Sequence, residues 1–316
     1  MRSKAPEVSK NGLSRVPKAL KPWVRHKGLV FMLIPCVLFF LIFHYTPMYG
    51  ITIAFKDYRA LDGILGSKWV GFEHFQNLFS GVEFPRVLWN TLFLSICRLI
   101  VGFPAPIILA LLLNEVRSSK YKKLVQTTTY LPYFFSWVVL GGILRMLLAY
   151  KGPVNGIIEG LGGTAIGFLS DDFWYIITYL LASMWHGAGY NAVIYLAALS
   201  GIDMDLYEAA MVDGAGRWKQ LLHITLPCLI PTIVTMFILG LGGILNAGFD
   251  QIYNTYNPLV YDVADILDTY VLRKLRTLDY SLGTAAGLFK SAVGAVLVFG
   301  SNWFARKISD NEYGLW

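Results

Sequence analysis

Six long apolar stretches restrict this chain more than any other feature of its sequence. A helix that crosses the roughly 30 Å hydrocarbon core of a bilayer needs about 20 apolar residues, because its backbone polar groups must be satisfied within the segment. Stretches of this length occupy residues 29–49, 87–113, 124–149, 173–201, 224–249 and 282–305. Hydrophobic residues form 55% of the chain and charged residues 15%, a balance that a water-soluble domain would have difficulty accommodating. The sequence therefore predicts an all-α integral membrane protein with six transmembrane helices.

Lysine and arginine are unevenly distributed between the segments that join these stretches. With the N-terminus inside the cell, sixteen of the 27 Lys and Arg residues fall on the cytoplasmic side, eight fall outside, and three lie within the stretches. Because cytoplasmic loops carry the excess of positive charge in membrane proteins, we predict an N-in/C-in topology. The expected parts are a basic cytoplasmic tail (1–28), a six-helix transmembrane domain (29–305) with a cytoplasmic loop at 202–223, and a cytoplasmic C-terminal tail (306–316).

Two other readings of the charge and the first stretch are excluded. The net charge of +7 is explained by the cytoplasmic basic residues, so no nucleic-acid partner is predicted. The first stretch is longer than the apolar core of a typical signal peptide and is not followed by a small-x-small cleavage site. We expect it to remain as a transmembrane anchor.

The sequence offers no set of residues for catalysis, metal binding or nucleotide binding. Cys36, Cys97 and Cys228 lie in or beside separate apolar stretches without CxxC spacing, and the five histidines are scattered over different segments. The phosphate-binding pattern G-x-x-x-x-G-K-[ST] is missing, since the glycine-rich run at 160–167 lacks the lysine. We therefore predict no catalytic residue, metal site or cofactor in this chain.

The loop between the fourth and fifth stretches carries the turn signals of a small helical projection. Asp205 can cap a helix, with Glu208 three residues later completing a capping-box-like pair. Gly214 suits the left-handed residue that ends such a helix. A second short helix through Trp218 then leads to Pro227, which can start the next span in its first turn. These signals predict a rigid helix-turn-helix projection into the cytoplasm.

The same loop carries a motif whose spacing is specific. Its members are Glu208, Ala209, Ala210, Gly214, Ile224, Leu226 and Pro227. This pattern resembles the EAA signature of the permease subunits of ABC importers, and the resemblance implies the type I importer permease fold. In that family the projection is a coupling helix that sits in a cleft of the ATPase subunit. The residues expected to couple to the ATPase are Tyr207, Glu208, Ala209, Ala210, Asp213, Gly214, Ala215, Leu226 and Pro227.

Further stretches resemble one branch of that family. WVGFEHFQNLF, from Trp69, is similar to the outer loop of carbohydrate-type permeases, and TYLPYFFSWVVLGGI, from Thr129, is similar to the polysaccharide-oligosaccharide branch, as is the terminal GLW. The resemblance implies a bacterial cytoplasmic (inner) membrane protein that works with a second homologous permease chain, two ATPase subunits that bind ATP and Mg, and an extracellular solute-binding protein. The implied substrate is an oligosaccharide, such as one derived from pectin or alginate.

The aromatic residues of the first outer loop are spaced for a short helix. Trp69, Phe72, Phe75 and Phe79 are separated by three or four residues, which predicts an amphipathic helix at the membrane surface. Two roles stay open: an aromatic belt in contact with lipid, or a docking surface for the solute-binding protein.

Polar and aromatic residues inside two stretches are candidates for the solute path, because intramembrane polar groups tend to face an aqueous cavity. The fourth stretch contributes Trp185, His186, Gly189, Tyr190 and Asn191. In the fifth stretch, Gly243, Asn246 and Asp250, with Gly240 and Ala247, follow helical spacing. Aromatic rings can stack on the C–H faces of sugars, and polar groups can bond their hydroxyls. The alternative is close helix packing through the glycines, with the polar residues bridging helices.

Three basic residues lie within the predicted spans. Arg98, Arg145 and Lys290 can snorkel to the interface or pair with a carboxylate of the partner permease. If two of them face the cavity, the path is positively charged and favours uronate-bearing sugars. Arg98 and Lys290 are therefore included among the candidates for the solute path.

Two alternative functions fit the sequence less well. A permease for a non-sugar solute would share the projection, so the carbohydrate assignment depends on the outer loop and the third stretch. A secondary transporter would need internal repeats or discontinuous helices with a coupling-ion site, and the sequence shows no convincing pair.

Overall fold

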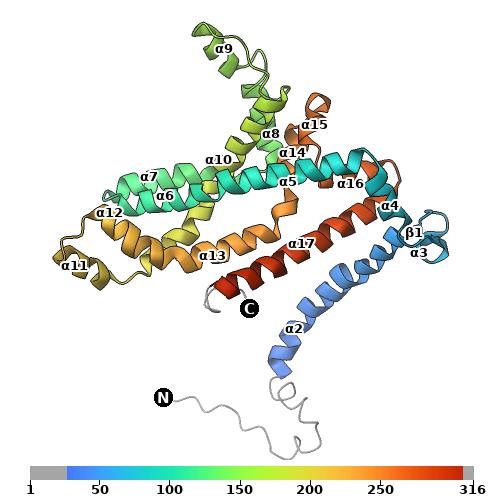
Figure 1. The fold of residues 1–316 in the computed structure, drawn as a ribbon, viewed down its shortest axis with the longest axis horizontal. Helices are drawn as coiled ribbons and strands as arrows, with labels where there is room; N and C mark the ends of the chain where they lie inside the picture. The colour runs from blue at the N-terminus through green and yellow to red at the C-terminus, as the bar shows by residue number, and fades with distance from the viewer. Residues whose placement is uncertain (1–26, 309–316) are drawn as a thin grey trace, which may run out of the picture.

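Residues 27–308 are described by the computed structural model, in which long helices dominate (Figure 1). The one sheet within these residues is an antiparallel ribbon of β1 (Lys56–Asp57) and β2 (Lys68–Trp69). Four helical segments are long and apolar enough to cross a membrane: Phe31–Phe55, Glu83–Glu115, Arg217–Leu241 and Tyr280–Phe304. The predicted helical membrane fold is therefore confirmed.

The long segments are composed of consecutive helices. They are α2 (Lys27–Phe40), η2 (Leu41–Tyr45) and η3 (Thr46–Phe55); α5 (Glu83–Gly102) and α6 (Pro104–Glu115); α10 (Asp172–Ser200); α12 (Arg217–Gln220), η5 (Leu221–Thr225) and α13 (Leu226–Gly242); and α17 (Tyr280–Ile308). At 29 residues α10 is long enough to cross a bilayer, but its tryptophan, histidine and glycine residues make it less apolar than the other four.

Two of these segments contain a π-helical turn just before a proline. Both η2 and η5 are π-helical, and Pro47 and Pro227 follow two residues after them. A proline lacks the N–H group for the helical bond, and its ring clashes with the carbonyl four residues earlier. The wider turn accommodates this clash, so each helix continues through its proline.

The stretch predicted to span the membrane over residues 124–149 is bent in the structure. The structure has α7 (Ser119–Tyr130), η4 (Leu131–Phe134) and α8 (Trp137–Leu147), with a bend of 103° between the two halves. Leu131 and Pro132 are still helical, in η4, and the bend falls at Phe135, which is extended (ψ 135°). Ser136 then caps the new helix by accepting a hydrogen bond from the Val139 amide (3.4 Å).

The span predicted over residues 224–249 begins and ends earlier than expected. The continuous helix starts at Arg217 and ends at Gly242, followed by η6 (Ile244–Asn246). Ala247 and Gly248 are both left-handed (φ 37° and 67°), and α14 (Phe249–Thr255) starts in a new direction. The helical spacing expected from Gly240 to Asp250 is therefore interrupted, since two successive left-handed residues end an α-helix.

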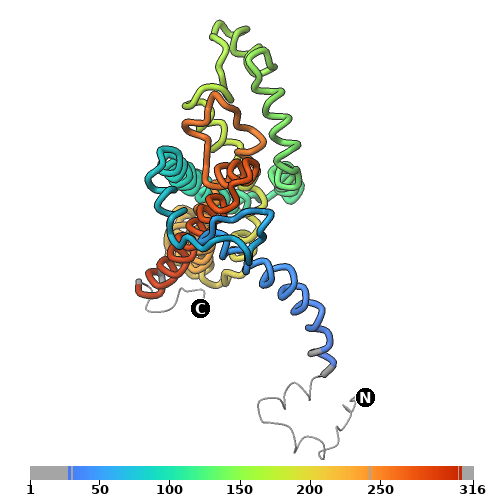
Figure 2. The backbone as a smooth tube through the Cα atoms, turned by 90° about the vertical axis from the view of Figure 1, so that its right-hand side faces the viewer, coloured from blue at the N-terminus to red at the C-terminus, as the bar shows by residue number. Residues whose placement is uncertain are grey.

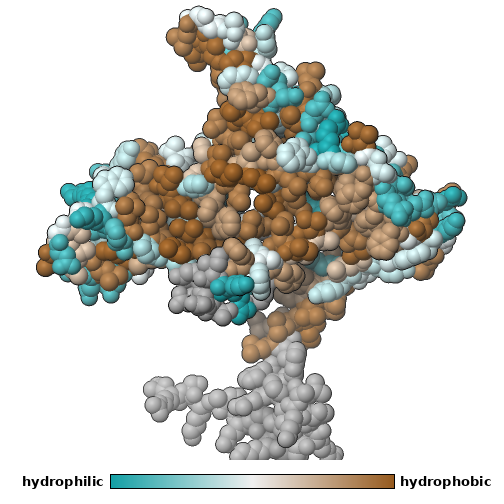
Figure 3. Space-filling view, viewed as in Figure 1, coloured by the Kyte–Doolittle hydropathy of each residue, from teal (hydrophilic) through white to brown (hydrophobic). Residues whose placement is uncertain are grey.

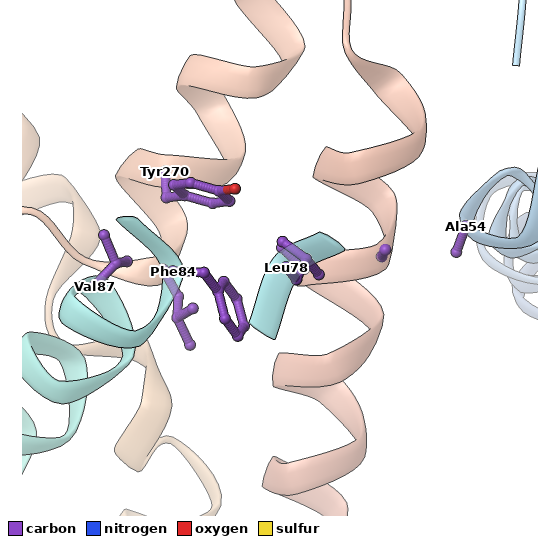
Figure 4. Packing of buried hydrophobic residues seen from close by; sticks show 8 residues of the cluster. Ala54, Leu78, Phe84, Val87 and Tyr270 are labelled. Carbon is purple, nitrogen blue, oxygen red and sulfur yellow. The ribbon is translucent and has the colours of Figure 1, made fainter. Parts of the chain in front are cut away.

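The first outer loop forms a helix that packs on the rest of the chain. The predicted amphipathic helix is present as α4 (Glu73–Ser80). Its Leu78 belongs to a buried cluster with Ala54, Phe84, Val87 and Tyr270, which come from η3, α5 and α16 (Leu267–Arg276) (Figure 4). The buried face of α4 is therefore covered by protein, whereas Trp69, Phe72 and Phe79 remain exposed.

The first membrane segment diverges from the body of the molecule (Figures 1 and 2). Every residue from 31 to 49 is exposed, and the chain begins to pack on α17 only at η3. Hydrophobic residues cover the centre of the face in Figure 3, and hydrophilic residues gather at its left end, where Figure 1 places α11 (Met204–Val212) and α12. This pattern is typical of a protein surrounded by lipid.

Candidate functional site

The loop after α10 forms the expected helix-turn-helix projection, defined here as residues 203–225. Its first helix is α11, which stops where Gly214 adopts a left-handed conformation (φ 76°). The Ala215 amide then donates to the Ala210 carbonyl (2.8 Å), a bond that closes the turn. The second helix, α12, continues through η5 into α13. The predicted shape and its glycine stop are confirmed.

The residue that caps α11 differs from the prediction. Asp203, not Asp205, is the N-cap, and its Oδ1 accepts the amide N–H of Asp205 (3.0 Å). Because α10 ends at Ser200, only a short connection remains, and helical geometry begins at Met204. Glu208 is therefore on the exposed side of the helix and forms no capping box.

The projection is tied together by few contacts. The hydroxyls of Tyr207 and Thr225 are 2.9 Å apart, and the Gln220 amide donates to the Ala215 carbonyl (3.0 Å). Neither α11 nor α12 contains a buried residue, and Met211, Val212 and Trp218 expose 58, 89 and 75% of their surfaces. Apolar side chains left this open on a preformed helix pair are typical of a surface that another protein covers.

The other candidate coupling residues follow the same pattern. Glu208, Ala209, Asp213, Gly214 and Pro227 are exposed, whereas Tyr207, Ala210, Ala215 and Leu226 are half-buried at the base. The small Ala210 and Ala215 line a shallow hollow of about 340 Å³ beside His223. The motif thus has an exposed part and a part that holds the projection together.

A cavity of about 480 Å³ lies among α5, α10 and α13. Of the predicted path residues, it is lined by Arg98, Asn191, Gly243 and Asn246. Gly240 and Ala247 line it too, as does Ser95, whose buried hydroxyl has no partner within the described residues. The structure therefore brings together one cation, two amides and small residues in a single wall.

The break after α13 is fixed by two reciprocal bonds to α10. The Tyr179 hydroxyl donates to the Ala247 carbonyl (2.8 Å), and the Gln251 amide donates to the Tyr179 carbonyl (2.8 Å). All three residues are buried. Since buried polar groups without partners are costly, these bonds hold the break in one conformation. Sequence reasoning missed Tyr179 and Gln251, because their roles depend on a break that the helical periodicity concealed.

Gly248 allows the intramembrane cation to approach the break. A Cβ atom at this position would lie 2.6 Å from Nη1 of Arg98. No carboxylate within residues 27–308 pairs with Arg98. A guanidinium without a counter-ion at the cavity wall gives the cavity a positive field.

Gly189 lies at a helix crossing, outside the cavity wall. A Cβ atom there would be 2.0 Å from the Thr129 carbonyl oxygen of α7. Gly189 therefore allows close packing of two helices, which was the alternative to a role in the solute path. Gly141 makes a similar close approach between α8 and α14, where a Cβ would be 2.8 Å from the Asn254 carbonyl oxygen.

The aromatic candidates of α10 contact the bend between α7 and α8. The Tyr190 ring stacks on Tyr133 (centroids 3.9 Å apart), and the His186 ring lies 4.6 Å from Trp137 and 5.5 Å from Tyr133. Trp185 exposes 51% of its surface. None of the three lines the cavity, so His186 and Tyr190 hold the bend against α10.

The remaining polar candidates are separate from the cavity. Lys290 forms an ion pair with Asp268 of its own chain (2.6 Å), which replaces the expected pairing with a partner permease. Asp250 is exposed on α14, beyond the break. Arg145 lines a second cavity of about 340 Å³ with Tyr150 and Ser170. Of the three intramembrane cations, only Arg98 faces the central cavity.

The segment between α13 and α17 is anchored by a buried ion pair. Asp265 is 1% exposed and accepts two hydrogen bonds from Arg273 (2.8 and 3.1 Å). Donating these hydrogen bonds to the Asp265 carboxylate raises the pKa of Arg273, so the guanidinium stays charged. Asn90 of α5 donates to the Asp265 carbonyl (3.2 Å). These contacts fix α15 (Tyr261–Ala264) and α16 against α5.

The fold and the projection define a class, the membrane-spanning component of a binding-protein-dependent transporter. The family model of the binding-protein-dependent transport system inner membrane component matches residues 102–310. The chain is 46% identical to protein LplB of Bacillus subtilis (strain 168) over 285 residues, 90% of each chain. It is 45% identical to the polygalacturonan/rhamnogalacturonan transport system permease protein YteP of the same organism, over 91% of this chain and 90% of that one.

A solved structure has the same fold. The crystal structure of a bacterial ABC transporter involved in the import of the acidic polysaccharide alginate matches with a TM-score of 0.87 and 40% sequence identity, covering 93% of this chain and 100% of that one. The bacterial alginate ABC transporter in complex with an alginate pentasaccharide-bound periplasmic protein matches with the same score and identity.

This chain belongs to the family of binding-protein-dependent transport system inner membrane components. It is the permease component of an ABC importer of the carbohydrate type, and it resides in the inner membrane. The resemblance identified from the EAA motif is confirmed.

Proposed function

We propose that this permease forms half of the translocation path for oligosaccharides that carry carboxylate groups, such as fragments of pectin or alginate. The observation that carries the proposal is the cavity, in which Arg98 has no carboxylate partner among the described residues and shares the lining with the amides of Asn191 and Asn246. Amides can bond sugar hydroxyls, and a guanidinium binds a carboxylate through two parallel hydrogen bonds. The alginate transporter and YteP, both similar over nine-tenths of this chain, support the substrate class.

The other half of the path comes from a second homologous permease chain. The exposed apolar length of α2 supports this arrangement, since a diverging helix leaves its faces to lipid and to a neighbouring chain. An extracellular solute-binding protein delivers the sugar, by analogy with the alginate-bound periplasmic protein in the related complex.

Two ATPase subunits, which bind ATP and Mg, supply the energy, and one of them docks on the projection. The support is its rigid turn at Gly214 with exposed Met211, Val212 and Trp218. In this arrangement α7, η4 and α8 form one bent span and α10 another, giving six spans with both termini in the cytoplasm. The arrangement in Figure 1 supports this, because the start of α2 and the end of α17 lie on the same side.

Uptake by the assembled transporter in proteoliposomes tests the substrate class. We expect Arg98→Ala to reduce uptake of a uronate tetrasaccharide at least tenfold while uptake of a neutral tetrasaccharide falls much less, because only the former loses a charged contact. Lys290→Ala is the matched control, since Lys290 is paired with Asp268 away from the cavity. Equal losses for both sugars in Arg98→Ala would refute charge selection.

A further inference from the structure

Four aromatic residues outside the cavity form a row on α14 and α15. The row consists of Phe249, Tyr253, Tyr256 and Tyr261, with successive ring centroids 5.5, 6.3 and 5.1 Å apart. All four side chains are partly exposed. Gln251, Ile252 and Thr255 are buried on the opposite side of α14, so the helix that carries Phe249 and Tyr253 is firmly seated.

The rings of this aromatic row are offset from one another. The first and last pairs are nearly parallel, with interplanar angles of 24°. Rings stacked face to face lie closer, as Tyr133 and Tyr190 do at 3.9 Å and 4°. Separations of 5.1 to 5.5 Å are within the range of offset aromatic pairs. The row therefore presents a stepped aromatic surface whose repeat is similar in length to one sugar unit.

One cation beside the row pairs with no carboxylate in the part of the chain that the structure describes. The last turn of α16 carries three basic residues, of which Arg273 pairs with Asp265 and Lys274 pairs with Glu83 (3.3 Å). The third, Arg276, is exposed and pairs with no carboxylate within residues 27–308. Its Nη2 donates to the Tyr253 hydroxyl (2.6 Å), and its guanidinium lies over the Tyr253 ring. The charge is thus fixed against the row and available to an anion.

The row begins close in the chain to residues of the central cavity. Asn246 and Ala247 line the cavity, and Phe249 follows at the start of α14. Further along the row, burial raises the pKa of Tyr256 to about 12, so its hydroxyl stays neutral and able to donate a hydrogen bond. Aromatic faces, neutral hydroxyls and an unpaired guanidinium are the groups that a chain of sugar rings with carboxylates can use.

We propose that the aromatic row and Arg276 form an outer binding track that holds a carboxylate-bearing oligosaccharide and directs it into the cavity. The inference rests on the proposed function. Sugar rings stack along the row, and a carboxylate pairs with Arg276. Because the contacts repeat along α14 and α15, the track favours chains of several sugar units over a single sugar.

The assembled transporter with its solute-binding protein, reconstituted in proteoliposomes, tests the charge part of the track. We expect Arg276→Gln to raise the half-saturating concentration for a uronate tetrasaccharide about tenfold, leaving the maximal rate and the uptake of a neutral tetrasaccharide unchanged. Arg59→Gln is the control, since Arg59 is an exposed arginine paired with Asp57 on the ribbon. An unchanged preference for the uronate sugar in Arg276→Gln would overturn the proposal.

The ring part of the track has its own variants. We expect Tyr253→Leu to raise the half-saturating concentration several-fold for both the uronate and the neutral tetrasaccharide, but not for the corresponding monosaccharides. Tyr253→Phe, which removes only the hydroxyl bonded to Arg276, should raise it for the uronate tetrasaccharide alone. Tyr58→Leu, which removes a ring packed edge-on against Tyr280, is the matched control. If Tyr253→Leu does not assemble, Tyr253→Phe and Arg276→Gln decide the outcome. Wild-type transporter that imports neither tetrasaccharide would refute the proposed function itself, before any variant is compared.

Discussion

The projection at residues 203–225 and the break at residues 243–251 both interrupt long helices, yet they are held in opposite ways. The projection has no buried residue in its two helices, whereas the break is fixed by buried bonds between Tyr179, Ala247 and Gln251. A structure secured by its own chain keeps its shape before any partner arrives. The buried bonds of the break therefore fix the shape of the cavity from within the chain. The projection instead exposes apolar residues, which is typical of a surface that a partner protein covers.

The largest effect is expected at Gly248. Gly248→Val combines a left-handed backbone with a Cβ atom 2.6 Å from Arg98 Nη1, and should lower the free energy of unfolding by about 3 kcal/mol. The melting temperature of the purified protein in detergent measures this loss. Gly243→Ala is the control, because Gly243 borders the same cavity and its added Cβ meets only the Gly240 carbonyl oxygen at 3.8 Å. Similar melting temperatures for both variants would contradict the described break.

A smaller loss is expected when one bond of the break is removed. Tyr179→Phe leaves the Ala247 carbonyl without its donor, which should cost about 1 to 2 kcal/mol. Tyr190→Phe is the comparison, since Tyr190 contributes mainly its stacked ring. If thermal unfolding shows no difference between the two variants, the bond to Ala247 does not stabilise the break.

Loss of the helix cap in the projection should destabilise α11 without destabilising the whole protein. Asp203→Ala removes the cap of α11, which should cost about 1 kcal/mol of helix stability while the melting temperature of the whole protein stays unchanged. Hydrogen exchange of the α11 amides is the measurement, and faster exchange is expected. Asp205→Ala should have little effect, because Asp205 donates its amide to the cap and its own side chain is not the cap. The reverse order of the two variants would restore Asp205 as the cap.

The smallest effect is expected at the base of the projection. Arg217 and Glu115 form an exposed ion pair (3.6 Å), and such pairs contribute little because water screens them. Arg217→Gln should therefore change neither the melting temperature nor the exchange of α11 amides. A clear loss in either measurement would show that the projection depends on α6 for its position.

The sequence predicted the parts of this molecule that depend on local patterns. Apolar length located the membrane segments, and Gly214 located the stop of α11, because a left-handed residue favours glycine. The same logic failed at the break, where Ala247 is left-handed without being a glycine and the small-residue spacing continues through residue 250. Helical periodicity there predicted one continuous helix.

The candidate path was predictable only in part, because it depends on tertiary contacts. Arg98, Asn191, Gly243 and Asn246 line one cavity, whereas Gly189 packs on Thr129. A glycine suits both a cavity wall and a close helix crossing, so its type cannot distinguish them. Lys290 finds Asp268 in a preceding helix, a pairing set by how α16 lies on α17.

Copurification of an ATPase with this permease tests the central claim most directly. The transporter is expressed with its partner subunits, and the ATPase retained on the tagged permease is measured for the wild-type chain, for Glu208→Lys with Gly214→Pro, and for Gly243→Ala. Glu208 and Gly214 are exposed on the projection, and Gly243 borders the cavity. We expect the wild-type chain and Gly243→Ala to retain the ATPase and the double variant to lose it. Full retention by a folded double variant would contradict docking on the projection.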